Sequence, residues 1–254
     1  MTTLTFELLH RRFNEMVASQ GITWRAVGFL APDDMVYAFG TDTKVISTVF
    51  ECCAAPLIGE IAEEYGYTVE GSPQTIYPDF TLSPATRQDQ RIAVDIKTTY
   101  RTFNQNGLLQ KFKYTLGSYT SFLRSPGATK NIKYPYAQYS DHWVIGFLYT
   151  RVEGVPAKVY RREQVEKLTC PYKDVDYFIQ EKYKIAGESP GSGNTTNIGS
   201  FPTNNMEDLR QGRGPFAKHG KEVCDDYWRH YGTKAPDREY GTVAEYLVWV
   251  KRKS

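Results

Sequence analysis

The stretch RIAVDIK, residues 91–97, alternates its side chains with the two-residue period of a β-strand. Because successive strand side chains point to opposite faces, the two isoleucines and the valine share one face, while Asp95 and Lys97 share the other. The stretch therefore predicts a buried strand from which a carboxylate and an ammonium group project side by side.

A second short motif, YPDF at residues 77–80, places Asp79 at the start of a neighbouring strand. Two carboxylates and one cation around a single point suit phosphodiester hydrolysis, because Mg²⁺ binds carboxylate oxygens together with water and phosphate oxygens. The metal stabilises charge on the phosphate and lowers the pKa of a bound water that attacks in line. Lys97 would hold or deprotonate that water, or neutralise the transition state, and the residues leave these roles open. They also leave open a simple turn at Pro-Asp and a solvated salt pair at Asp-X-Lys.

Composition limits the class of protein. The chain has 254 residues, of which 41% are hydrophobic, so it can bury a sizeable core in one large domain or in two. No window approaches the ~20 apolar residues that span a bilayer, and the N-terminus lacks a basic segment followed by an apolar core. The cysteines and histidines show no zinc-ligand spacing. We therefore expect reduced thiols, a cytoplasmic protein and no membrane partner.

The formal net charge of +2 is unevenly distributed along the chain. Residues 1–100 hold seven Lys and Arg against 13 Asp and Glu, whereas residues 101–254 hold 24 against 16. An acidic segment that contains the metal ligands, followed by a basic remainder, suits a hydrolase that binds a polyanion. An ordinary solvated surface can produce the same distribution, so this support is weak.

The order of predicted elements indicates an α/β protein with a mixed central sheet and helices packed on it. Asp42 is the predicted N-cap of a long helix that contains Pro56 and ends at Gly66. The expected elements are a helix over 3–20, a strand–turn–strand over 24–39, a helix over 43–65, strands over 91–100, 143–149 and 175–185, and a helix over 243–251.

Two further features have both an ordinary and a functional interpretation. The loop GSGNTTNIGS, residues 191–200, is typical of a flexible surface connection. It could equally read DNA, because its glycines allow close backbone approach, Asn pairs with adenine and a Thr methyl packs on thymine. Glu51 lies on the long helix, where solvent exposure is the simplest interpretation.

Several longer segments resemble the type II restriction endonucleases of the Pro-Asp…Asp/Glu-X-Lys nuclease superfamily. The resemblance runs from about residue 35 to the C-terminus, whereas the N-terminal helix and hairpin match poorly. The matching segments are residues 41–51, 77–82, 94–100, 119–122, 129–132, 149–152 and 191–200.

The resemblance implies a role for each matching position. Asp79 and Asp95 match metal-binding aspartates, Lys97 the catalytic lysine, and Glu51 an auxiliary acidic, metal-binding residue on the helix. Gln74 matches a loop that approaches DNA from the minor-groove side. The residues that match the base-recognition loop are Gly191, Ser192, Gly193, Asn194, Thr195 and Thr196. Those that match positions near phosphates are Thr99, Thr120, Ser121 and Lys130.

The resemblance also implies a restriction-endonuclease-like fold and a complete activity. It implies a single domain over 1–254, with a dimerisation portion over about 1–40 plus part of the core and a DNA-binding, catalytic portion over about 41–254. The implied enzyme is a homodimer that uses Mg²⁺ to cut both strands of duplex DNA, with GATATC cut bluntly at its centre as the implied site. A DNA methyltransferase of the same system and a prokaryotic cytoplasm complete the expectation.

Some residues depart from the family pattern. Gln74 is followed by Thr75 and Ile76 where the pattern has Asn and His, and the stretch 101–113 is longer than the pattern. Gly117-Ser118 replaces a double glycine. Two alternatives to a restriction enzyme are a repair or structure-selective nuclease of the same superfamily and a DNA-binding homologue that does not cleave.

Overall fold

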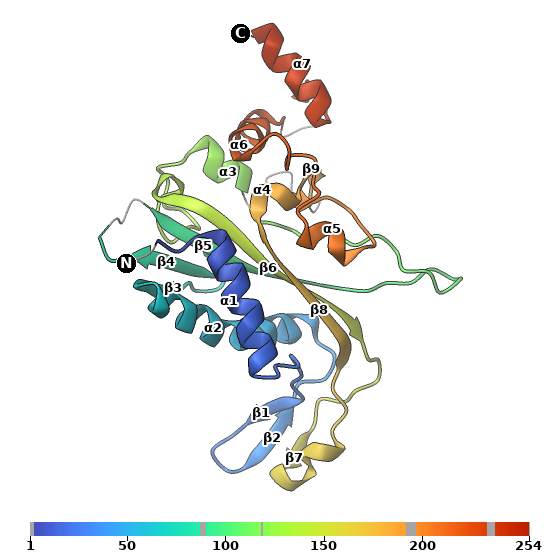
Figure 1. Cartoon of the computed structure of the whole chain (residues 1–254). Coiled ribbons are helices and arrows are strands. Elements are labelled where there is room, and N and C mark those ends of the chain that lie inside the picture. The colour runs from blue at the N-terminus through green and yellow to red at the C-terminus, as the bar shows by residue number, and fades with distance from the viewer. Residues whose placement is uncertain (1–2, 87–89, 118, 192–196, 233–236, 254) are drawn as a thin grey trace.

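The computed structural model describes residues 3–86, 90–117, 119–191, 197–232 and 237–253. Its largest sheet has five strands in the order β3-β4-β5-β6-β8 (Figure 1). Strands β5 and β6 run parallel, and the other neighbouring pairs are antiparallel, which confirms the predicted mixed sheet. The strands are β3 (Tyr67–Gly71), β4 (Phe80–Pro84), β5 (Arg91–Tyr100), β6 (Tyr139–Arg151) and β8 (Tyr172–Glu181).

The alternation in β5 assigns its side chains to two different cores. Ile92, Val94 and Ile96 are buried in the core on one face of the sheet. Ala93, which shares the face of Asp95, is buried in the core on the other face. The predicted division of this strand is therefore confirmed.

Two helices cover the face that buries Ile92 and its neighbours (Figure 1). Helix α1 spans Phe6–Ser19 and α2 spans Thr43–Glu64, as predicted to within a few residues. The Asp42 side chain accepts hydrogen bonds from the backbone N–H groups of Lys44 and Val45, so it is the predicted N-cap.

Helix α2 corrects one expectation from the sequence. Among the described residues it is long and apolar enough to cross a membrane by length and composition alone, contrary to our prediction that no such stretch exists. Its Phe50, Ile58 and Ile61 side chains are fully buried against the sheet. This burial is typical of the central helix of a globular core.

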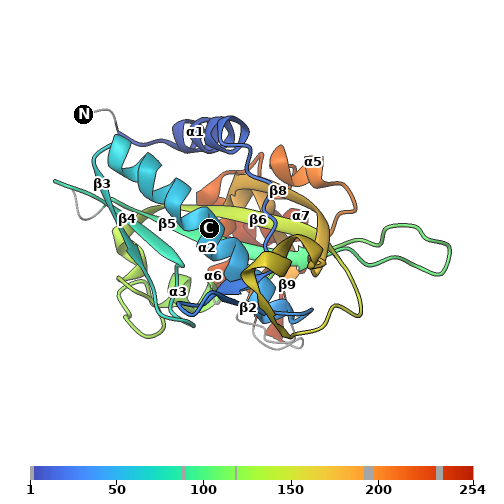
Figure 2. The ribbon, with the colours of Figure 1, turned by 90° about the horizontal axis from the view of Figure 1, so that it is seen from below.

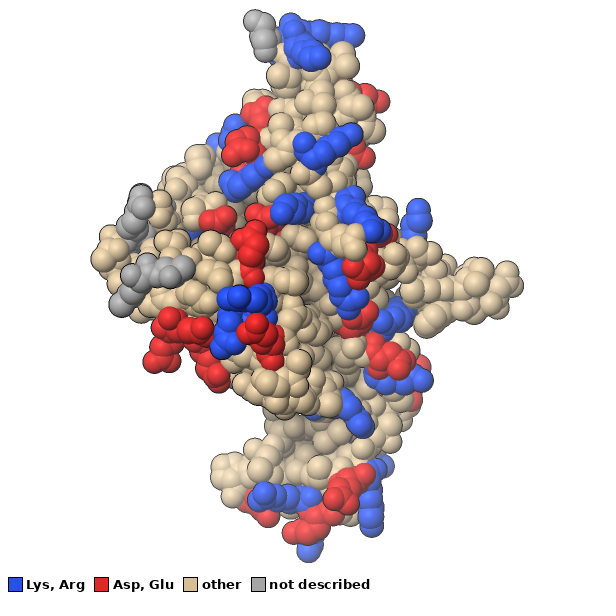
Figure 3. Space-filling model, in the orientation of Figure 1, with Lys and Arg blue, Asp and Glu red and all other residues tan. Residues whose placement is uncertain are grey.

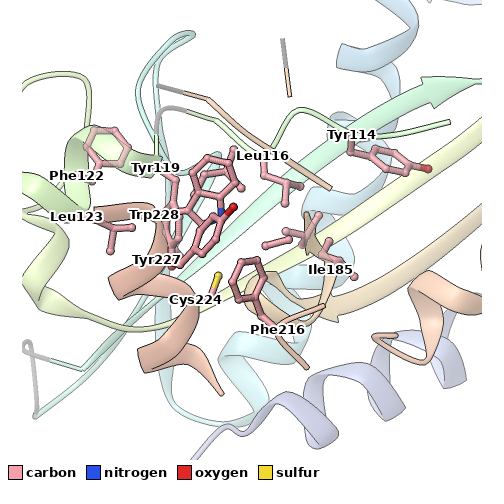
Figure 4. Close-up of a cluster of buried hydrophobic side chains, with 14 of the residues drawn as sticks. Tyr114, Leu116, Tyr119, Phe122, Leu123, Ile185, Phe216, Cys224, Tyr227 and Trp228 are labelled. Atoms are coloured by element: carbon pink, nitrogen blue, oxygen red, sulfur yellow. The ribbon is translucent and has the colours of Figure 1, made fainter. Parts of the chain in front are cut away.

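The opposite face of the sheet carries short helices and an aromatic core, part of which is drawn in Figure 4. Tyr119, Tyr227 and Trp228 are almost completely buried there. Figure 1 shows α7 beyond this layer, at the C-terminal end of the chain. The elements on this side are α3 (Tyr119–Arg124), η1 (Tyr136–Gln138), α4 (Lys182–Ile185), β9 (Ala186–Pro190), β10 (Ile198–Ser200), α5 (Met206–Arg210), α6 (Lys221–His230) and α7 (Val243–Lys253).

The predicted strand over 175–185 is wrong at its C-terminal end. Strand β8 stops at Glu181, and Lys182–Ile185 forms the single helical turn α4. Lys182 and Ile185, three residues apart, are both buried, and helical spacing brings them to the same side. Tertiary burial of these two side chains therefore decides the local conformation.

A separate three-stranded sheet lies at the end of the molecule remote from α7 (Figure 1). It consists of β1 (Gly28–Leu30), β2 (Met35–Ala38) and β7 (Val159–Arg161), followed by η2 (Arg162–Lys167). The predicted strand–turn–strand is confirmed by β1 and β2. Phe29 faces Tyr37, and Tyr37 faces Val159, so that three large side chains form a row across the sheet. All three are about half exposed.

Gly146 on β6 lies between Lys97 of β5 and Phe178 of β8. A Cβ atom at this position would overlap the Phe178 ring. We expect Gly146→Ala to lower the free energy of unfolding by about 1–3 kcal/mol, the usual effect of overpacking a core. Gly59→Ala in α2 is the control, because a Cβ atom there would meet only open space. Since alanine is favoured over glycine within a helix, this change should raise the free energy of unfolding by about 0.5–1 kcal/mol. Urea denaturation measures both changes, and a Gly146→Ala variant as stable as wild type would contradict this packing.

Candidate active site

The predicted trio of charged residues comes together in the structure. Lys97 Nζ lies 2.9 Å from Asp95 Oδ2 and 3.5 Å from Asp79 Oδ2. Asp79 immediately precedes β4, whose Phe80 pairs with Val94 of β5, so the two strands bring the carboxylates to the same lysine. The Asp79 carboxylate is held in place by the backbone N–H of Ile96, which donates to Oδ2 at 2.6 Å.

Electrostatics within the trio give its members different protonation behaviour. Burial raises the pKa of Asp79 to about 7, the charge on Asp95 adds to this rise, and Lys97 opposes it. Burial also disfavours the charged form of Asp95, but Lys97 and Lys182 outweigh burial and lower its pKa. For Lys97, burial is outweighed by Asp95 and Asp79, so its pKa is raised. Without a metal, the centre therefore holds a firmly ionised Asp95–Lys97 pair beside a carboxylate that takes up a proton near neutral pH.

The oxygen donors of this centre fit a hard cation. Asp95 Oδ2 is buried and, although it is ion-paired with Lys97, it has no well-formed hydrogen bond within the described residues. Over the same residues, no group of three or more His, Cys, Asp or Glu side chains is placed to hold a metal. Two carboxylates are sufficient for Mg²⁺, because this ion keeps several waters and also takes substrate phosphate oxygens.

Glu51 stands apart from the trio. It lies on α2, the helix that covers the face opposite to Asp95 and Lys97, and its side chain is half-buried. Burial raises its pKa, with Lys97 and Asp95 close enough to exert opposite effects on it. In the part of the chain that the structure describes, no hydrogen bond or ion pair joins Glu51 to the trio. Glu51 thus lies near the centre, and its metal-binding role stays a prediction.

A cleft of about 410 Å³ opens onto the trio and is the space available to a substrate. Thr75 and Ile76 line it, so the turn that follows Gln74 forms part of its rim. Gln74 itself is exposed in this turn. The other lining residues are Tyr77, Asp79, Asp95, Lys97, Gly117, Phe122 and Asn131.

Lys182 is a second cation at the centre, and sequence reasoning missed it. Only 2% of this residue is exposed, and its Nζ lies 3.9 Å from Asp95 Oδ2, the oxygen that Lys97 also contacts. Its Nζ also donates to Tyr77 Oη at 3.2 Å, and Tyr77 Oη is hydrogen-bonded to His142 Nδ1 at 2.7 Å. Burial lowers the pKa of Lys182 to about 8. The sequence offers little sign of this role, because one lysine at the end of a predicted strand suggests a solvent-exposed side chain.

The residues predicted near phosphates differ in accessibility. Ser121 and Lys130 are exposed, and Thr99 is partly exposed near the end of β5. Thr120 is completely buried in α3, so its side chain does not reach the surface in this conformation. The phosphate role of Thr120 stays a prediction that this placement does not favour.

The predicted base-recognition loop lies largely outside the described residues, which include Gly191 but not Ser192, Gly193, Asn194, Thr195 or Thr196. Its two ends are close together, because the Gly191 N–H donates to the carbonyl oxygen of Asn197 at 2.8 Å. A Cβ on Gly191 would lie 2.9 Å from the Gly199 Cα, so the two chain segments need glycine to approach this closely.

Comparison with known proteins agrees with this fold and site. The family described as restriction endonuclease EcoRV matches residues 20–251. The type II restriction enzyme EcoRV of Escherichia coli is 44% identical over 230 residues, which are 89% of this chain and 90% of that enzyme. The protein is thus a type II restriction endonuclease, a site-specific deoxyribonuclease whose substrate is DNA. The chain belongs to the EcoRV family, and restriction enzymes of this kind are generally metal-dependent.

The extent of the match corrects one detail of the sequence analysis. The family match begins at residue 20, and not near residue 35, so the hairpin formed by β1 and β2 lies inside it. Helix α1 precedes the matched region.

Proposed function

We propose that this protein hydrolyses both strands of duplex DNA in a Mg²⁺-dependent reaction at the trio of Asp79, Asp95 and Lys97. The observation that carries the proposal is the shared lysine, whose Nζ lies 2.9 Å from one carboxylate and 3.5 Å from the other. Two carboxylates that converge on one point at the wall of a cleft can hold a cation and a phosphate in the same place.

Each residue then has a defined task. When bound, Mg²⁺ supplies charge stabilisation for the phosphate and a water of lowered pKa. Asp79 and Asp95 hold the ion, and Lys97 orients the attacking water or neutralises the charge that develops on the phosphate. Lys182 acts as a buried positioning residue that holds the Asp95 carboxylate in place. Glu51 acts as an auxiliary acidic residue that contributes to metal binding from α2, near enough to Lys97 and Asp95 for both to act on its pKa.

Specificity follows from the loop over 191–196 and from the turn at Gln74. We assign base reading in the major groove to the loop, and the minor-groove side to the turn on the cleft rim. The target is GATATC cut bluntly at its centre, and the central TA step of this sequence is easily kinked. Thr99, Ser121 and Lys130 meet phosphates and set register.

Asn194→Ala should weaken discrimination more than general affinity. An Asn side chain that bonds adenine bidentately contributes about 1–3 kcal/mol of discrimination, whereas it adds nothing to binding of random DNA. Competition of GATATC and random duplexes for the variant measures this ratio. Equal losses of affinity for the two duplexes would refute base reading by Asn194.

The active enzyme is proposed to be a homodimer, in which a two-fold protein reads a palindrome and each subunit cuts one strand. The half-exposed row of Phe29, Tyr37 and Val159 supports an interface on the three-stranded sheet. The dimerisation portion is then residues 1–40 with β7 from the core, and residues 41–254 bind and cut DNA.

The surroundings of the enzyme follow from this activity. Because cleavage of unmodified GATATC would damage the host genome, we propose a DNA methyltransferase in the same system, without direct contact. The four free cysteines agree with a reducing prokaryotic cytoplasm, which we propose as the location.

Digestion of a sequenced plasmid, with Mg²⁺ or EDTA and with every end mapped, tests the proposed function. Blunt cuts confined to GATATC and dependent on Mg²⁺ are expected. Cuts at another palindrome would support the proposed hydrolysis and reject GATATC as the target sequence. Cuts at branched or damaged DNA would favour a structure-selective nuclease, and specific binding without cuts would indicate a homologue that only binds DNA.

A further inference from the structure

An ordered arm, residues 101–111, leaves β5 at its end and projects from the body of the protein (Figures 1 and 2). Its two sides are joined by backbone hydrogen bonds: the Asn104 N–H donates to the carbonyl oxygen of Leu108 at 3.0 Å, and the Gln110 N–H donates to that of Thr102 at 2.9 Å. The turn is closed by the Asn104 side chain, which accepts from the N–H groups of Asn106 and Leu108. The arm therefore has a defined shape of its own.

The tip of the arm exposes large apolar side chains. Phe103 is 51% exposed and Leu108 is 64% exposed, although neighbouring backbone groups are hydrogen-bonded. In Figure 3 the arm is the tan projection on the right, and its tip carries no charged residue. A short hairpin that stands in water with its apolar side chains uncovered is only marginally stable, so this tip needs a partner surface.

Charge favours DNA as that partner. Residues 101–117 contain three basic residues and no Asp or Glu. After the arm, the chain alternates as a strand does, with Phe112 and Tyr114 buried and Lys111 and Lys113 exposed. The exposed side of this segment is thus a basic row suited to phosphates.

The basic row leads directly to the start of the proposed base-recognition loop. Lys113 Nζ donates to the carbonyl oxygen of Pro190 at 3.3 Å, and Thr115 Oγ1 donates to that of Gly191 at 3.4 Å. A duplex read by residues 191–196 would therefore continue past Lys113 and Lys111 toward the arm. The row of Phe29, Tyr37 and Val159 already offers a separate surface for a second copy of the chain.

We propose that the arm binds duplex DNA outside the recognition sequence, with Lys111 and Lys113 on phosphates and the Phe103–Leu108 tip against the wall of the minor groove. Minor-groove binding proteins commonly combine apolar side chains with Asn and Gln. The tip offers Asn and Gln beside its apolar side chains. The tip is about five residues from Arg101, so the extended arm reaches roughly 16 Å from the body of the protein. This length corresponds to about five base pairs along a duplex. The inference rests on the course of DNA past residues 191–196 that the proposed function assigns.

The test compares binding to two duplexes with the same central GATATC, one ending about two base pairs beyond it on each side and the other about ten. Anisotropy titrations without a divalent metal prevent cleavage. The Phe103→Ser/Leu108→Ser variant should bind the long duplex about fivefold to tenfold more weakly than wild type and the short duplex equally well. For Lys111→Gln on the long duplex, the slope of log affinity against log salt concentration should become shallower by about 0.9, the value for one phosphate that is no longer neutralised. On the short duplex this slope should not change. Val248→Ser and Lys218→Gln, at exposed positions outside residues 101–113, are the controls.

Each outcome is informative. Equal losses of affinity for both duplexes, or no loss for either, would overturn the proposal, as would a change in dimer mass that points to a second copy as the occupant. Random-sequence duplexes of the same two lengths separate this inference from the proposed specificity, because phosphate and groove-wall contacts do not require GATATC. If the Phe103→Ser/Leu108→Ser variant loses affinity only for the long random duplex, and wild type shows no preference for GATATC, the assigned target sequence is rejected. The proposed contact between the arm and DNA is then still supported.

Discussion

Lys97→Ala is expected to lower the single-turnover rate of DNA cleavage by at least about 10³-fold, the upper range for removal of one group that stabilises transition-state charge. The variant keeps both carboxylates, but it loses the cation that we propose to orient water or to neutralise the phosphate in the cleft. We expect no substitution by Lys182, because it is buried and is not among the described residues that line the cleft. Sequence-specific binding should change by no more than a few fold, since we assign base reading to the loop over residues 191–196.

Gel analysis of a plasmid with one target site, under enzyme excess, measures this rate. Lys184→Ala is the matched control, because Lys184 pairs with Glu181, lies two residues beyond Lys182 and is ion-paired with no member of the trio among the described residues. Wild-type turnover by Lys97→Ala would remove this lysine from the mechanism.

If the protein is the homodimer that we propose, Tyr37→Glu is expected to convert it to a monomer and to abolish cleavage of both strands. Tyr37 is the middle member of the exposed row, directly between Phe29 and Val159. In a two-fold interface the substitution places two like charges in an apolar contact, and disruption of a central contact typically weakens association by about 2–4 kcal/mol, or roughly 30-fold to 1,000-fold.

Sedimentation velocity over a range of concentrations measures the association, and the ratio of nicked to linear plasmid reports cleavage of the second strand. Val248→Glu is the control, since Val248 is equally exposed on α7. A Tyr37→Glu protein that remains dimeric and linearises the plasmid would place the interface on another surface.

Strand β5, which carries Asp95 and Lys97, could be predicted because its pattern is local. Alternation over residues 91–97 is sufficient to assign the faces of Asp95 and Lys97, and Asp79 follows from a neighbouring strand start. The cap at Asp42 was likewise predictable, because its hydrogen bonds reach only two and three residues along the chain.

Contacts between distant segments could not be predicted in this way. Lys182 reaches Asp95 across 87 positions of sequence, and no periodicity in either segment indicates their meeting. Nothing in the local pattern around Glu51 indicates that its helix covers the other face of the sheet. The longer stretch over 101–113 is evident from the resemblance, but its projection from the body depends on the backbone pairing of Thr102 with Gln110.

We propose that Asp79 and Asp95 together hold the metal beside Lys97. The most direct test of this proposal is a titration of Mn²⁺, followed by electron paramagnetic resonance, into protein bound to a GATATC duplex with a hydrolysis-resistant linkage at the central step. Asp79→Asn and Asp95→Asn should each weaken binding at least about tenfold, because each removes a charged ligand of a two-carboxylate site. Asp225→Asn, which removes a buried carboxylate bonded to Tyr119 and Lys221, should bind Mn²⁺ like wild type. Unchanged Mn²⁺ affinity in both Asp79→Asn and Asp95→Asn would show that neither carboxylate is a ligand of the metal.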